Sequence, residues 1–235
     1  MSIRPEIIPF LIASVVVGAV LLAALRVSRV SLGKALVASG IVVIILCAYM
    51  VCFFRDPVRV APVDPALIVA GAEGKVMAVV DVVEPTFLKT NAVRISIFLS
   101  LIDVHVNRAP IAGRVEFAQY FPGARYFTFE EKSSTFNQHS SILIKGERTS
   151  CLVNQIVGPV ARRVVYWLKV GQDLKKGEPF GMMKFGSRLD MYFPRGDVEV
   201  LVKPGDKVLA GETVVARILP PPGGGPVDLE KKGTP

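Results

Sequence analysis

Two short stretches of the chain carry side chains whose types and spacing suit acid-base and nucleophilic chemistry. Asp103 and His105 lie within Ser100–Pro110, in a chain that has only two histidines. Because they are two residues apart on a segment expected to be extended, they should face the same side, an acid beside a base. A purely structural cluster at a strand end is the alternative. The other histidine, His139 in Asn137–Ser140, is predicted to be an ordinary loop residue.

The second stretch is a glycine followed by a serine between two apolar runs. Phe180–Met183 and Leu189–Phe193 flank residues 184–188, and this pattern predicts a hairpin with a small nucleophile at its tip. The carbonyl group of Gly186 has no side chain shielding it, so the hydroxyl group of Ser187 can fold back within bonding reach of it. An ordinary Gly-Ser turn is the alternative.

The body of the chain, residues 57–219, is predicted to consist mainly of β strands that position these residues. Short runs rich in Val and Ile are punctuated by Gly and Pro, and no helical period appears in them. Residues 220–235 are rich in Pro and Gly and then charged, which predicts a disordered tail. Besides the two runs around Ser187, the expected strands are 74–83, 93–99, 113–120, 140–145, 149–157 and 162–168.

An internal repeat lies on either side of the Gly-Ser pair. Residues 169–180 match residues 203–214 at a constant offset of 34. Two such units with a hairpin between them resemble the barrel-sandwich fold of biotinyl and lipoyl carrier domains, in which the tip between the repeats carries the functional residue. Glycines are expected to mark the turns at 171, 177, 205 and 211, and apolar side chains are expected to point inward at 174, 180, 208 and 214.

The N-terminal segment, residues 1–56, is predicted to be a membrane-anchoring helical hairpin. Ile7–Leu25 and Ala35–Phe54 are uncharged apolar runs, and each approaches the ~20 residues that cross a hydrocarbon core. Cations occur both in the connection between the runs and after the second run, so the charge pattern does not distinguish a spanning hairpin from a shallow one. Arg55 and Arg59 are expected at the level of the lipid phosphates.

Bulk composition points to a lipid surface as the partner. The net charge of +8 fits an anionic partner, and a predicted anchor favours acidic lipid over nucleic acid. The three cysteines, Cys47, Cys52 and Cys151, form neither a disulfide framework nor a metal-ligand cluster. We therefore expect no metal, and a location at the cell membrane with the body on the cytoplasmic face.

Taken together, these motifs resemble the short-chain phosphatidylserine decarboxylases over about residues 53–215. The motifs occur in the order and spacing of that family, which supports a mainly β fold and a pyruvoyl-dependent enzyme. The stretches that carry the resemblance are Phe53-Phe54-Arg55-Asp56-Pro57, Arg94–Ser100 leading into Asp103–Pro110, and Lys184-Phe185-Gly186-Ser187-Arg188.

The resemblance implies a proenzyme that cuts itself between Gly186 and Ser187. Ser187 would become a covalent pyruvoyl group at the start of an α chain, 187–235, which stays with the β chain, 1–186, as a heterodimer that can oligomerise further. The pyruvoyl ketone would form a Schiff base with the serine amine of phosphatidylserine and accept the electrons left by loss of CO2, giving phosphatidylethanolamine. The family pattern assigns an acid-base role to Asp103, with His105 beside it.

Some features depart from the family pattern and leave alternatives open. Leu101 follows Ser100 where proline is usual, and His139 matches the loop histidine of longer members only loosely, so the processing base is not identified.

An ether-linked archaeal lipid would present the same headgroup chemistry. Met183-Lys184-Phe185 also resembles the lysine motif of biotinyl carriers, so a carrier or a membrane adaptor without enzymatic activity is the other alternative.

Overall fold

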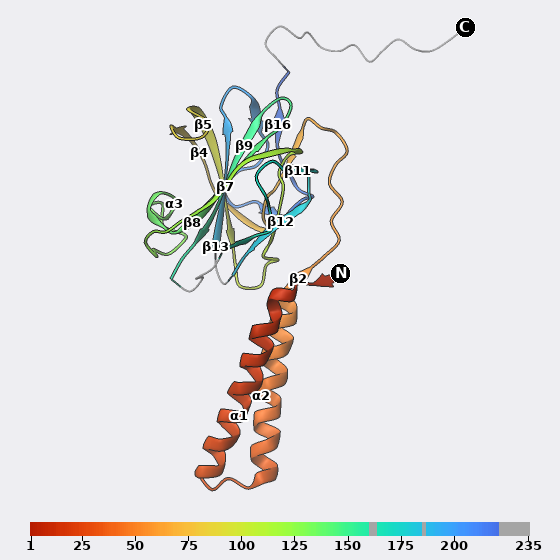
Figure 1. The fold of residues 1–235 in the computed structure, drawn as a ribbon, viewed down its shortest axis with the longest axis vertical. Coiled ribbons are helices and arrows are strands. Elements are labelled where there is room, and N and C mark those ends of the chain that lie inside the picture. Colours follow the sequence, from red (N-terminus) through yellow and green to blue (C-terminus); the bar gives the residue numbers. More distant parts are fainter. Residues whose placement is uncertain (160–163, 185–186, 221–235) are drawn as a thin grey trace, which may run out of the picture.

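The computed structural model describes residues 1–159, 164–184 and 187–220. A helical hairpin of α1 (Ile8–Val27) and α2 (Leu32–Phe53) extends from one end of a β body, and β2 (Arg55–Asp56) lies at the junction (Figure 1). Both helices are long and apolar enough to cross a membrane, and most of their side chains are exposed rather than packed inside the protein. The predicted pair of N-terminal apolar helices is confirmed.

The body is built around an eight-stranded antiparallel sheet that curls into a half-barrel. Its strand order is β11-β7-β8-β9-β13-β5-β4-β15, so β13 lies near the middle between β9 and β5. The strands are β4 (Gly74–Glu84), β5 (Thr90–Leu99), β7 (Gly113–Phe121), β8 (His139–Lys145), β9 (Ser150–Val157), β11 (Asp173–Leu174), β13 (Ser187–Pro194) and β15 (Lys207–Val208).

Two three-stranded sheets and a few short elements complete the described part of the body. One sheet has the order β10-β12-β6 and the other β14-β16-β3, and β1 pairs with β2. These elements are β1 (Ser2–Ile3), η1 (Pro5–Ile7), β3 (Leu67–Val69), β6 (Val106–Arg108), α3 (Ser133–Phe136), β10 (Val164–Tyr166), β12 (Pro179–Met183), β14 (Val198–Val200) and β16 (Val214–Ile218).

Most of the predicted strands are confirmed. Their side chains alternate between the two faces of a sheet, as the pattern of β13 shows. In β13, Leu189, Met191 and Phe193 join the main hydrophobic core, whereas the residues between them face the other side of the sheet. The run predicted at 162–168 contains only the short strand β10, and residues 160–163 lie outside the described part. The predicted tail at 220–235 lies outside it from residue 221 onward.

The internal repeat is confirmed in its backbone conformation. All four predicted turn glycines have positive φ, between 77° and 103°, a region that residues with a Cβ rarely adopt. The hydrogen bonds also repeat: Gly171 donates to Val115 at 2.7 Å, and Gly205 donates to Val76 at 2.8 Å. The inward side chains are buried at 174, 180 and 208, but Val214 is only half-buried because the register of β16 shifts there and Val215 takes the core position.

The predicted hairpin around the Gly-Ser pair is wrong. β12 pairs with β10 and β6, whereas β13 pairs with β5 and β9, so the two runs belong to different sheets. Each run has a neighbouring strand along both of its edges within its own sheet, so neither run has an edge left to pair with the other. Ser187 is the first residue of β13 rather than the tip of a hairpin, and Gly186 lies outside the described residues.

Candidate functional site

Ser187 lies in the interior at the first position of a central strand. It pairs with Leu99 of β5 on one side and with Val157 of β9 on the other. Strand alternation places it on the same face as Leu189, toward the core. The side chain is fully buried, and its hydroxyl oxygen has no hydrogen-bond partner among the described residues. A buried hydroxyl group without a partner costs free energy, which marks this position as a candidate for chemistry.

His105 is a neutral histidine with one nitrogen free to act as a base. Its Nδ1 lies 2.8 Å from the carbonyl oxygen of Asp103. Because a carbonyl oxygen only accepts, Nδ1 carries the hydrogen and Nε2 keeps its lone pair. Burial lowers the pKa of His105 to about 4, so the ring is uncharged at neutral pH. Nε2 is buried and has no partner among the residues that the structure describes.

Asp103 does not lie on an extended segment beside His105, contrary to the predicted arrangement. Residues 100–103 form a turn, and the Asp103 carboxylate folds back onto Ser100. Its Oδ2 accepts hydrogen bonds from the Ser100 backbone N–H at 2.7 Å and from the Ser100 hydroxyl at 2.6 Å. The turn closes because the carboxylate satisfies both donors, and Asp103 contacts His105 through its backbone carbonyl.

The turn brings Ser187 and His105 to the same end of the body. Leu99, the β5 residue opposite Ser187, directly precedes the turn, and His105 follows it. The carbonyl group of His105 accepts a hydrogen bond from the N–H of Met183 at 3.2 Å, at the end of β12. Ser187, Asp103 and His105, which the sequence identified, are thus held within one short connection and the two strands beside it.

Glu73, which sequence reasoning missed, directly precedes β4 and anchors the same turn. Its Oε1 accepts a hydrogen bond from the Val104 N–H at 3.2 Å, and its carboxylate also pairs with Arg59. Arg59 contacts Glu212 at 3.0 Å, and Arg55 donates to the Ile102 carbonyl at 2.8 Å. Both arginines are thus engaged with the protein, and their expected depth at the level of the lipid phosphates stays a prediction.

The helical hairpin packs directly against this end of the body. Phe53 and Phe54 are fully buried, and the Phe53 ring lies 4.0 Å from the His105 ring between centroids. The hydroxyl of Tyr49 in α2 donates to the carbonyl group of Leu101 in the turn at 3.2 Å. The end of α2 therefore forms one wall of the site, because its last aromatic side chains cover the histidine.

A second group of buried polar side chains lies on the interior face near Ser187. Gln155 of β9 donates from Nε2 to Oδ1 of Asn107 in β6 at 2.7 Å. Ser140 of β8 is paired with Gln155 in the sheet. Each of the three is fully buried, and each retains one polar atom without a partner in the described part of the chain. The signal in the sequence was a single Gln between inward-facing apolar residues of a strand, Val153 and Val157.

The opposite face of β13 carries a buried ion-pair network that holds the strand in place. Arg188 is 1% exposed and donates from Nε to Asp190 at 2.7 Å and from Nη2 to Ser96 at 2.8 Å. Ser134 of α3 donates to the other carboxylate oxygen of Asp190 at 2.7 Å. The network fixes the backbone that immediately follows Ser187, and sequence reasoning did not identify it.

His139 is not a loop residue, contrary to the prediction. It begins β8, and its ring stacks on Phe121 at 5.2 Å between centroids. Its Nδ1 lies 2.8 Å from the carbonyl oxygen of Asn137. His139 pairs with Ile156, the strand neighbour of Arg188, so it faces the side of the sheet opposite to Ser187.

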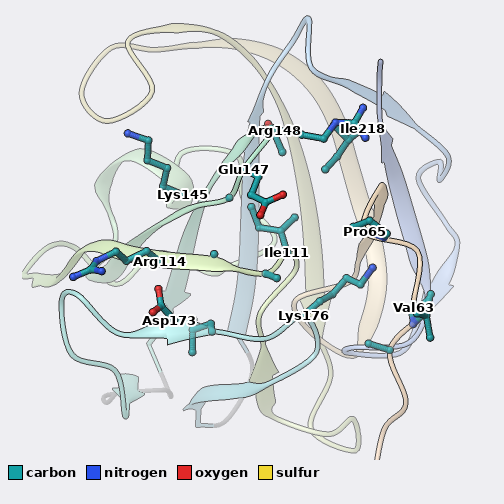
Figure 2. Close-up of a pocket in the computed structure, with 17 residues that line it drawn as sticks. Val63, Pro65, Ile111, Arg114, Lys145, Glu147, Arg148, Asp173, Lys176 and Ile218 are labelled. Carbon is teal, nitrogen blue, oxygen red and sulfur yellow. The ribbon is translucent and has the colours of Figure 1, made fainter. Parts of the chain in front are cut away.

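One cavity lies away from this site. It has a volume of about 760 Å³ and is lined by charged and apolar side chains that include Arg114, Lys145 and Lys176 (Figure 2). It includes Thr149, which precedes β9, whereas Ser187 pairs with the last residue of that strand. At ~3.3 Å per residue the two ends are roughly 25 Å apart. The cavity is therefore separate from Ser187. Among the described residues, no group of His, Cys, Asp and Glu could hold a metal ion.

Comparisons with known proteins identify the family of this chain. The family model described as phosphatidylserine decarboxylase matches residues 46–216. A relative from Carboxydothermus hydrogenoformans, named phosphatidylserine decarboxylase proenzyme, is 46% identical over 179 residues, which are 76% of this chain and 84% of that protein. One from Symbiobacterium thermophilum with the same name is 41% identical over 182 residues, 77% of this chain and 84% of that protein. The chain belongs to the phosphatidylserine decarboxylase family.

Proposed function

We propose that this chain is a proenzyme that cuts itself between Gly186 and Ser187 and then decarboxylates phosphatidylserine to phosphatidylethanolamine. The observation that carries the proposal is the buried hydroxyl group of Ser187 at the start of β13, which has no partner among the described residues and lies at the same end of the body as the uncharged His105. The names of the relatives support the lipid substrate and the processing step. A diacyl lipid and an ether-linked lipid would present the same headgroup to this site.

In the cut, the Ser187 oxygen attacks the carbonyl carbon of Gly186. The hydroxyl proton goes to a base, the amide bond breaks, and its nitrogen takes up a proton, which leaves an ester between the two residues. Removal of the Cα proton of residue 187 then expels the carboxylate of the β chain, and addition of water with loss of ammonia leaves a ketone. His105 suits the base role because its Nε2 carries a lone pair and the Asp103 carbonyl fixes the tautomer.

The residues around position 187 fit a pyruvoyl group. The side chain of residue 187 is fully buried and its hydroxyl oxygen has no partner among the described residues, so conversion of its Cβ to the methyl group of a pyruvoyl would break no hydrogen bond there. The ketone oxygen would stand on Cα in place of the backbone nitrogen. Such a group supplies a carbonyl that takes the amino group of the substrate and accepts the electrons released with CO2. The chain's own residues exclude water, hold the backbone after position 187 and move protons.

The helices and the position of the site support a phospholipid substrate. The turn that carries Asp103 contacts α2, so the site lies where the apolar hairpin joins the body (Figure 1). We infer that the hairpin, within residues 1–56, anchors the protein in the cell membrane and that the body, residues 57–219, lies on its cytoplasmic face. The free thiols of all three cysteines are compatible with that side.

The carrier alternative receives no support from the position of its lysine. The ammonium group of Lys184 lies 5.5 Å from the ring centroid of Phe10 and 6.0 Å from that of Phe54. A carrier lysine must project into solvent to exchange its prosthetic group between enzymes, whereas this side chain lies between the body and the helices.

The experiment that tests the proposal is a mass measurement of the purified protein with a matched serine variant. Wild type should separate into chains 1–186 and 187–235 with a blocked α-chain terminus. Ser187→Ala should stay uncut and inactive because it removes the attacking oxygen. Ser150→Ala, which changes the first residue of β9, should be cut normally. An intact wild-type chain with full decarboxylase activity would refute the proposal.

A second variant addresses the role of Asp103. Asp103→Asn should slow the cut about tenfold or more, because the turn that orients His105 loses charge-assisted hydrogen bonds worth roughly 1.5–3 kcal/mol. The fraction of uncut chain on a denaturing gel over time gives the rate. Cutting at the wild-type rate would show that neither the turn nor proton transfer depends on this carboxylate.

A further inference from the structure

We propose that Asn107, Gln155 and Ser140 form an uncharged subsite that binds the carboxylate group of the substrate's serine headgroup. The inference rests on the proposed function and adds to it the residues that recognise the headgroup. The three side chains come from three strands, β6, β9 and β8, and all are fully buried. They are joined by one hydrogen bond of 2.7 Å, from Gln155 to Asn107.

The sheet register places this group within reach of position 187. Ser187 pairs with Val157, and Gln155 lies two residues before Val157 on the same face. Such diagonal neighbours have Cα atoms about 7–8 Å apart. That spacing leaves room for an amino acid headgroup held at residue 187 to extend its carboxylate toward the donors beside Gln155, which are Nδ2 of Asn107 and the hydroxyl group of Ser140. Gln155 also approaches β12, because a Cβ added at Gly181 would lie 3.0 Å from its Nε2.

Hydrogen-bonding groups without partners indicate that the subsite is built for a ligand. Nδ2 of Asn107, Oε1 of Gln155 and Oγ of Ser140 are buried and have no partner among the described residues. A buried polar group without a partner costs free energy, so apolar side chains would give a more stable core here. If both amides were turned over, so that Asn107 donated to Gln155, one N–H group and one C=O group of the pair would still be without a partner. Together with the hydroxyl group of Ser140, the pair presents two donors.

The absence of charge on these three side chains suits a reaction that loses CO2. A cation would stabilise the carboxylate of the bound substrate more than the departing neutral CO2, and would thereby raise the barrier. Neutral donors orient the carboxylate without that penalty. Arg188, next to Ser187 in the chain, lies on the other face of β13 and is paired with Asp190. The product amine has no carboxylate to bind the subsite, which favours its release.

The test compares two soluble headgroups on the mature protein in detergent. Glycerophosphoserine and glycerophosphoethanolamine are each incubated with the enzyme and sodium cyanoborohydride, which reduces the product of amine and ketone to a stable secondary amine. The mass of the α chain reports capture, and for the serine compound the adducts with and without the carboxyl group are added together. Wild type should capture the serine headgroup in preference to the ethanolamine headgroup.

Variants of the subsite, each compared with wild type, test whether these side chains cause the preference for the serine headgroup. Ser140→Ala should reduce the preference about tenfold, the loss expected for one hydrogen bond to a charged group. Gln155→Leu should also reduce it, because Asn107 then loses the hydrogen bond that orients its amide toward the carboxylate. Ser141→Ala is the matched control, because Ser141 is the next residue of β8 and its hydroxyl bonds to Asn154 on the opposite face at 2.8 Å. Its preference should equal that of wild type. If Gln155→Leu does not mature, Ser140→Ala against Ser141→Ala decides.

Failure of this inference can be distinguished from failure of the proposed function. An α chain without a blocked, amine-reactive terminus in wild type would contradict the proposed function itself. A mature wild type that captures both headgroups equally would overturn the subsite. So would an unchanged preference in Ser140→Ala, which is the result expected if ordered water alone occupies these polar groups.

Discussion

Acid should destabilise the body through one histidine. The pKa of His105 is about 4 in the folded protein, because burial disfavours the charged ring, against an ordinary value of 6.5. The unfolded chain therefore binds a proton at this position more readily than the folded chain below pH 6.5. The stabilising contribution of the neutral ring is present above pH 6.5 and is lost as the pH falls toward 4. Linkage gives a loss of about 2 kcal/mol between pH 7 and pH 5, approaching about 3 kcal/mol below pH 4.

The assay is thermal unfolding of the uncut Ser187→Ala protein in detergent at several pH values. For a body of this size, 2 kcal/mol corresponds to a fall in Tm of about 4–8 °C between pH 7 and pH 5. In a Ser187→Ala/His105→Gln protein this part of the fall should disappear, because glutamine does not titrate. The matched control is Ser187→Ala/His139→Gln, in which the fall should remain, since His139 is the only other histidine.

Two results would refute the reasoning about His105. The first is an unchanged pH dependence of Tm in the His105→Gln protein, which would show that this ring does not control the acid transition. The second is loss of the dependence in the His139→Gln protein, which would assign the transition to the histidine at the start of β8. Either result would also remove the argument that an uncharged Nε2 is available as a base at neutral pH.

Two further predictions concern stability, and each compares a variant with a control substitution in the uncut Ser187→Ala protein. Asp190→Asn should lower the free energy of unfolding by about 3 kcal/mol, because it removes the buried carboxylate that pairs with the buried charge of Arg188. Asp81→Asn, whose ion pair is exposed, should change it by less than about 0.5 kcal/mol in a denaturant titration. Phe53→Ala should cost about 3–5 kcal/mol because the ring is fully buried between helix and body, whereas Phe129→Ala, 61% exposed, should change the free energy of unfolding by less than about 1 kcal/mol. Equal effects within either pair would contradict the packing described above.

Local patterns in the sequence predicted most of the fold. Strand alternation depends on neighbouring residues alone, and the repeat was visible because only glycine readily adopts the backbone angles required at Gly171 and Gly205. The hairpin prediction failed for a different reason. Two apolar runs that are close in the sequence need not pair with each other. Here β12 pairs with β10 and β6, and β13 pairs with β5 and β9.

The site was predicted only where its residues lie close together in the sequence. The segment with Asp103 and His105 was identified from its composition, but the turn that separates their side chains depends on Ser100 satisfying the carboxylate. The bond between Gln155 and Asn107 joins residues 48 positions apart, so no local pattern could reveal it. The network of Arg188 likewise depends on α3 covering the outer face of the sheet.

The central place of β13 in the sheet bears on when the chain folds and on how long the cut protein persists. The strand is paired at eight positions with β5 and at six with β9, and both neighbours precede it in the chain. If the backbone is cut before Ser187, the first strand of the new α chain is already enclosed by the β chain. Folding must then come before the cut, and the two separated chains would face a bimolecular search to rebuild the middle of a sheet. Persistence of the mature protein would depend on how slowly β13 is released, so its durability is a matter of rates rather than of equilibrium.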